Sequence, residues 1–131
     1  MFGFFKKKSK PEKTEEKVEL STEEKDRLNE DNQQLLSKIS ATSDDQTELA
    51  RLHEQLGLNY AKLEQTDNAI ESLEKSLEEK LTIGDGYKKL MSLYNGKRAE
   101  AARNGDDAGI EKYMSKMDEM RQIAKKVTIS G

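Results

Sequence analysis

The chain contains no cysteine and no tryptophan, and its one proline is Pro11. Without cysteine it can form no disulfide, no thiolate metal site and no cysteine nucleophile. It has no run of about 18 apolar residues, so the sequence predicts no membrane-spanning helix. The amino terminus lacks the apolar stretch of about 7 to 15 residues that a secretory signal needs, because lysines directly follow MFGFF. We therefore expect a cytoplasmic protein.

Apolar residues are scarce as well. Hydrophobic residues make up 33% of the 131 residues and charged residues 37%, which suits helices that each bury one narrow stripe. β-Branched residues form none of the alternating runs that strands require. The length allows one domain. We predict a single all-α domain over residues 21–131.

Charge is distributed unevenly, although the net charge is only -3. Residues 21–83 carry seven basic and fifteen acidic groups, a net charge of -8, and residues 84–131 carry ten basic and seven acidic groups, a net charge of +3. Nucleic-acid binding relies on many Lys and Arg contacts to phosphates. The acidic middle of the chain therefore argues against a nucleic-acid partner.

All three phenylalanines lie within the first five residues and precede a lysine cluster. The Lys/Glu-rich run that follows has nothing to bury, so we interpret residues 1–20 as a disordered tail. Two interpretations of its tip remain: a start that contacts nothing, or a weak anchor at the inner membrane surface with rings at the headgroup level and lysines near anionic lipid. The candidate membrane contacts are Phe2, Phe4, Phe5, Lys6, Lys7 and Lys8.

Capping and turn signals predict five helices. Ser21 and Glu24 form a capping-box pattern that begins a helix over about 22–40. Ser43 or Asp44 is expected to cap the second helix, and Asp67 to open the third. IGDG and NGDD predict the turns on either side of a fourth helix that continues through Gly96 to Arg103. The expected inward stripes are Leu28, Leu35, Leu36 and Ile39; Leu49, Leu52, Leu56, Tyr60 and Leu63; Ile70, Leu73, Leu77 and Leu81; Tyr87, Leu90, Met91, Leu93 and Tyr94; and Ile110, Tyr113, Met114, Met117, Met120, Ile123, Ala124 and Val127.

The second and third predicted helices recur later in the chain. A shift of thirty-four places Leu56 on Leu90 and Tyr60 on Tyr94, and a shift of forty places Ile70 on Ile110. A repeated helix pair near 34 residues is typical of stacked repeats such as the tetratricopeptide pattern W-x₂-L-G-x₂-Y, A-x₃-F, P. The residues that match or replace this pattern are His53 for Trp, Leu56, Gly57, Tyr60, Ala69, Leu73 for the aromatic residue and Leu81 for Pro. On these residues the chain resembles the tetratricopeptide repeat (TPR) family.

The resemblance implies an α-solenoid fragment of about five antiparallel helices. It divides the domain into a capping helix at about 22–40, one good repeat at about 44–83 and a degenerate repeat at about 84–128. Two repeats are fewer than the three usually needed for a continuous stack, so the outer helices must cover its ends. A second copy of the chain is an alternative cover, and it would make a homodimer.

The resemblance also explains why a glycine stands inside a helix, where it costs about 1 kcal/mol relative to alanine. In such a repeat the small residues of the two helices face each other, so we expect Gly57 to approach Ala69. In the second copy Met91 would fill the same space opposite Gly109.

No pattern in the sequence indicates an enzyme, a metal site or a cofactor. His53 is the only histidine, and a packing role suits it better than metal binding. The carboxylates are explained by solvated helix faces, and GDGYKK lacks both the spacing and the preceding strand of a phosphate-binding loop.

The function expected from the resemblance is a scaffold or adaptor that binds a peptide or helix of a partner protein. A membrane-associated protein held by its tail is the alternative. Met114, Met117 and Met120 could form an adaptable binding surface, although core packing fits their spacing better. The candidate groove residues are Arg51, Glu54, Leu58, Lys62, Lys88, Ser92 and Asn95. Glu54 and Leu58 replace the Lys and Asn of the clamp with which some TPR proteins hold a terminal carboxylate.

Overall fold

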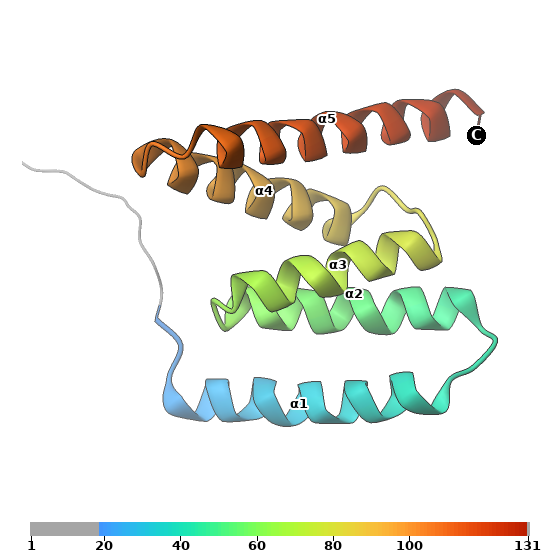
Figure 1. The fold of residues 1–131 in the computed structure, drawn as a ribbon. Coiled ribbons are helices and arrows are strands. Elements are labelled where there is room, and N and C mark those ends of the chain that lie inside the picture. The colour runs from blue at the N-terminus through green and yellow to red at the C-terminus, as the bar shows by residue number, and fades with distance from the viewer. Residues whose placement is uncertain (1–18, 131) are drawn as a thin grey trace, which may run out of the picture.

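The computed structural model describes the backbone of residues 19–130 and the side chains of residues 19–127. This part of the chain forms five helices and no strand, which confirms the predicted all-α class. Figure 1 shows three tiers, with α1 alone on one side, the α2–α3 pair in the middle and the α4–α5 pair on the other side. The helices are α1 (Thr22–Ala41), α2 (Gln46–Lys62), α3 (Thr66–Glu79), α4 (Asp85–Arg103) and α5 (Asp107–Ser130).

The capping box predicted at the start of α1 is confirmed. Ser21 Oγ accepts the Glu24 N–H at 3.1 Å, and the Glu24 carboxylate accepts the Ser21 N–H at 3.0 Å. The same hydrogen bond from Ser21 lowers the pKa of the Glu24 carboxyl. Two backbone donors that a helix start leaves without partners are thereby satisfied.

Most other helix ends fall within two residues of the prediction, but α3 ends at Glu79, before Leu81, which the prediction placed on the inward stripe of that helix. Asp45 caps α2 by accepting the Glu48 N–H at 3.0 Å, so the expected caps Ser43 and Asp44 are wrong. α3 begins at Thr66, one residue before the expected Asp67. α4 runs through Gly96 as predicted, and no atom outside that glycine's own segment lies within 4 Å of the place where a Cβ would be.

Gly57 is buried where α2 crosses α3. A Cβ at this position would lie 2.6 Å from Leu73 Cγ and 3.2 Å from the Leu73 backbone nitrogen. The predicted close approach is therefore present, but the three nearest atoms belong to Leu73. The expected partner Ala69 lies one helical turn earlier on α3 and is fully buried.

The pairing predicted between Met91 and Gly109 is wrong. The atoms nearest to a Cβ at Gly109 belong to Asp106 and Ala101, and Ala101 Cβ is 3.0 Å away. Met91 precedes Ala101 by ten residues, which is about 15 Å along a helix at 1.5 Å per residue. In the α4–α5 hairpin, whose helices are longer, the small residues meet near the turn. This turn contains Gly105, whose backbone has the left-handed conformation.

The tiers are joined in chain order. Among the described helices, the backbone of α4 lies close to those of α2, α3 and α5, whereas the backbone of α1 lies close only to that of α2. The side chains of α5 also reach α3, as in the Lys116–Glu74 ion pair. Buried apolar side chains form one cluster at the α1–α2 contact and a second among α3, α4 and α5. The first contains Leu35, Leu52 and Leu56, and the second contains Leu73, Leu90, Tyr94 and Met120.

A buried polar cluster also joins α1 to α2. Asn59 is 1% exposed, and its amide nitrogen donates to Asp31 at 2.8 Å and to Asn32 at 2.9 Å. Its amide oxygen accepts a hydrogen bond from Gln55 at 3.1 Å. Sliding α1 along α2 would leave these buried groups without partners, which is costly. The cluster therefore favours one register between the two helices.

Several residues of the predicted apolar stripes face solvent instead. Leu36 is 45% exposed, because α1 has only one neighbour and needs a narrower stripe. On α5, Met114 is 55% exposed while Met120 is 7% exposed. Met117 is partly buried against the core. The expected continuous stripe on α5 is thus buried only in part.

Candidate functional site

Two grooves lie on opposite faces of α4. At about 100° per residue, Lys88 and Ser92 project roughly 180° away from Leu90 and Tyr94. The first pair lines a groove shared with α2, and the second pair lines a groove shared with α3 and α5. We call them the α2–α4 groove and the α3–α5 groove.

The α2–α4 groove encloses about 580 Å³ and is basic. Lys62, Lys88 and Lys89 surround the half-buried Leu58, and Asp85 is the one acidic residue of the lining. Its residues are Gln55, Leu58, Ala61 and Lys62 from α2, and Asp85, Lys88, Lys89 and Ser92 from α4. This groove joins a small apolar patch to a positively charged rim.

The structure brings four of the seven predicted groove residues together. Leu58, Lys62, Lys88 and Ser92 all line the α2–α4 groove. Lys89 lines the same groove but was not predicted, because only its neighbour Lys88 was placed on the face of α4 that looks toward α2.

Arg51 and Asn95 are predicted groove residues that engage in local pairs outside this lining. Arg51 forms an ion pair with Glu48 at 2.6 Å one turn earlier on α2, which raises the pKa of the guanidinium and lowers that of the carboxyl. The side-chain oxygen of Asn95 accepts a hydrogen bond from Arg98 Nε at 3.0 Å. Neither residue lines the α2–α4 groove.

Glu54, the third residue outside the lining, caps α4. The helix begins after Gly84, which has no side chain to accept a hydrogen bond from the first turn. The Glu54 carboxylate accepts the Gly86 N–H at 2.8 Å instead. A negative charge at a helix amino terminus is also favourable because of the helix dipole. The absence of a capping side chain before α4 was the sequence signal for such a long-range cap.

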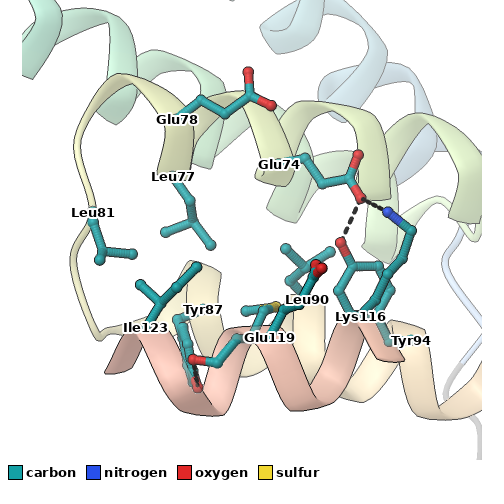
Figure 2. Close-up of a pocket in the computed structure, with 11 residues that line it drawn as sticks. Glu74, Leu77, Glu78, Leu81, Tyr87, Leu90, Tyr94, Lys116, Glu119 and Ile123 are labelled. Carbon is teal, nitrogen blue, oxygen red and sulfur yellow. Dashed lines mark hydrogen bonds and ion pairs between the residues drawn. The ribbon is translucent and has the colours of Figure 1, made fainter. Parts of the chain in front are cut away.

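The α3–α5 groove was not predicted. It encloses about 390 Å³, and α4 forms its floor, because α3 and α5 both pack on α4 and meet each other only through side chains, such as Glu74 and Lys116. Figure 2 shows its apolar side chains converging from the three helices and from the segment after α3. They are Leu77, Leu81, Tyr87, Leu90, Tyr94, Met120 and Ile123. The apolar periodicity of these helices was visible in the sequence, but the gap between α3 and α5 was not.

A polar cluster closes one end of the α3–α5 groove. The Tyr94 hydroxyl donates a short hydrogen bond to Glu74, and Lys116 Nζ lies 3.4 Å from the same carboxylate oxygen (Figure 2). Burial raises the pKa of the Tyr94 phenol, and its hydrogen bond to Glu74 raises it further. The phenol therefore stays a neutral donor, and Lys116 balances the charge of Glu74.

Two further carboxylates belong to the α3–α5 groove. Glu78 and Glu119 are both exposed, and Figure 2 shows Glu78 pointing away from the apolar residues. At the opposite wall the Tyr87 hydroxyl donates to the Met120 carbonyl at 3.0 Å. The lining thus carries three carboxylates and one ammonium group, so its charge is opposite to that of the α2–α4 groove.

His53 is half-buried on α2, and its Nδ1 is buried without a hydrogen-bond partner. Burial lowers the pKa of its imidazole, Lys75 lowers it further, and Glu79 opposes them. No group of three or more His, Asp or Glu side chains suited to a metal ion occurs among residues 19–127.

The candidate membrane contacts Phe2 to Lys8 lie outside the described residues. Within residues 19–130, none of the helices combines the length and the apolar character that crossing a bilayer requires.

Comparison with known proteins gives no significant match to this chain among protein-family models, curated proteins or solved structures.

Proposed function

We propose that the chain is a TPR-like, non-enzymatic protein-interaction module whose α2–α4 groove binds an acidic segment of a partner protein. The observation that carries this proposal is the convergence of Lys62, Lys88 and Lys89 around Leu58. A groove of this kind offers one apolar contact and several charge-assisted hydrogen-bond donors.

The arrangement of the tiers supports the TPR-like part of the proposal. In stacked repeats each unit contacts only its neighbours, and the three tiers, α1, α2–α3 and α4–α5, are in contact in that order. The close approach of α2 and α3 at Gly57 gives a physical reason for the L-G pair of the resemblance. The groove lies between α2 and α4, the first helices of the two proposed repeats.

Charge favours acidic side chains along the partner over a terminal carboxylate. The positions that a carboxylate clamp would give to Lys and Asn are occupied by Glu54 and Leu58, and Glu54 already binds the Gly86 N–H. Lys62, Lys88 and Lys89 are exposed, so they keep their mobility and suit several spaced acidic groups. Association should therefore weaken as salt screens the charges.

An NMR titration tests the proposal with a blocked peptide of alternating Glu and Leu. We expect amide shifts at Leu58, Ala61 and Ser92, and a loss of affinity of about tenfold, or ~1.4 kcal/mol, in the double variant Lys62→Glu/Lys88→Glu. Lys125→Glu is the matched control, because Lys125 is exposed on α5 and lines neither groove. Equal weakening by a single Lys62→Glu substitution and by Lys125→Glu, or equal binding of a Lys/Leu peptide, would contradict the proposal.

A further inference from the structure

We propose that the chain's own amino-terminal segment, residues 2–8, occupies the α3–α5 groove. This groove is distinct from the α2–α4 groove, so the inference does not depend on the partner proposed above. It joins two features: an apolar cleft with an acidic rim, and a phenylalanine cluster followed by lysines in the sequence.

The first argument is the apolar surface that the groove leaves uncovered. Leu77 and Leu81 are only half-buried, and Ile123 is 42% exposed, although all three face the groove. Burying such side chains contributes roughly 25 cal/mol per Å² of apolar area removed from water. A volume of about 390 Å³ is at the small end of the range of about 300–1,000 Å³ for ligand sites. The space therefore suits aromatic rings from a short segment better than a whole helix of a second copy.

Charge is the second argument, and it distinguishes the two grooves. Glu74, Glu78 and Glu119 outnumber Lys116 in the α3–α5 groove, so its rim attracts the lysines at positions 6–8. The α2–α4 groove carries three lysines and one aspartate, so it repels them. An apolar tip with a basic flank is complementary to the first groove in both respects.

The third argument is reach. Figure 1 shows α1 and α3 beginning on the same side of the molecule. Glu74 lies eight residues into α3, about 12 Å along the helix, and two helix spacings of 8–10 Å separate α1 from α3, which gives roughly 20–30 Å to cover. The eleven residue-to-residue steps from Lys8 to Glu19 span up to roughly 36 Å when extended. The segment can therefore reach the groove of its own molecule.

Because the chain has no cysteine, a nitroxide on Ser9→Cys labels one site in the full-length protein. Paramagnetic broadening in methyl spectra should reduce the intensities of Leu77, Leu81 and Ile123 relative to the reduced, diamagnetic label. The intensity of Leu58, which lies on α2 and lines the groove on the opposite face of α4, should be retained. The same label in the triple variant Phe2→Ser/Phe4→Ser/Phe5→Ser should restore the groove intensities.

Two further measurements identify other occupants. In one measurement, isotope-labelled chains without a nitroxide are mixed with spin-labelled chains. Broadening that persists in this mixture would assign the groove to a second copy and overturn the proposal. Sedimentation with vesicles of anionic lipid that depends on the three phenylalanines, with no broadening at Ile123, would assign the segment to a membrane instead. Uniform broadening, or none, also overturns the proposal, whereas binding of the Glu/Leu peptide should be unaffected by the phenylalanine substitutions.

Discussion

Gly57 and Gly96 are both helical glycines in very different surroundings. A Cβ at Gly57 would lie 3.2 Å from the Leu73 backbone nitrogen, whereas nothing lies within 4 Å of one at Gly96. We expect Gly57→Ala to destabilise the protein by about 1–3 kcal/mol, because the overpacking exceeds the gain in helix propensity.

Gly96→Ala is the matched control, and it should stabilise by about 0.5–1 kcal/mol. Urea unfolding of the two variants gives both values. Stabilisation of both variants to the same extent would mean that α2 and α3 do not approach closely at Gly57.

His53 predicts a pH dependence of stability. Its folded pKa is lowered by burial and by Lys75, so the folded state binds this proton less readily than the unfolded chain, where the pKa is about 6.5. The contribution of His53 to the free energy of unfolding is therefore complete above about pH 6.5 and is lost as the pH falls toward the lowered pKa. Between about pH 7.5 and 5.5, wild type should lose more stability than His53→Gln, as measured by urea unfolding. Parallel pH profiles would contradict this.

At the scale of the elements, Glu54 supplies the cap that α4 lacks locally. Removing its carboxylate leaves the Gly86 N–H without its 2.8 Å partner. We expect Glu54→Ala to cost about 1 kcal/mol and to speed amide exchange at Gly86. Glu54→Gln retains an acceptor oxygen but no charge, so its loss should be smaller. Equal losses in the two variants would assign the effect to charge and not to the hydrogen bond.

At the scale of the whole molecule, the order of contacts predicts local unfolding. α1 contacts α2 alone, through Leu35, Ile39 and the Asn59 cluster. Leu35→Ala should cost about 2–5 kcal/mol at this contact. Hydrogen exchange should then show lower protection in α1, with α4 and α5 protected as in wild type, because a stack of units opens from its ends. An equal fall in protection across all helices would indicate one cooperative bundle.

The helices were largely predictable because their determinants are local. The capping box at Ser21 spans three residues, and the apolar spacing and turn residues act over one or two helical turns. Four of the predicted groove residues also line one groove, since two neighbouring helices present the same face along their length. The misplacements on α1 and α5 arose because periodicity does not say how much of a helix face a neighbour covers.

The sequence by itself therefore determined the all-helical class and most of the helix ends. Only the tertiary structure decided that Glu54 caps Gly86 and that Asn59 meets Asn32, pairs that are 32 and 27 residues apart. It also created the α3–α5 groove, because α3 and α5 pack on the same helix with their backbones apart. Such features depend on how whole helices are placed in space, which no local pattern of residues encodes.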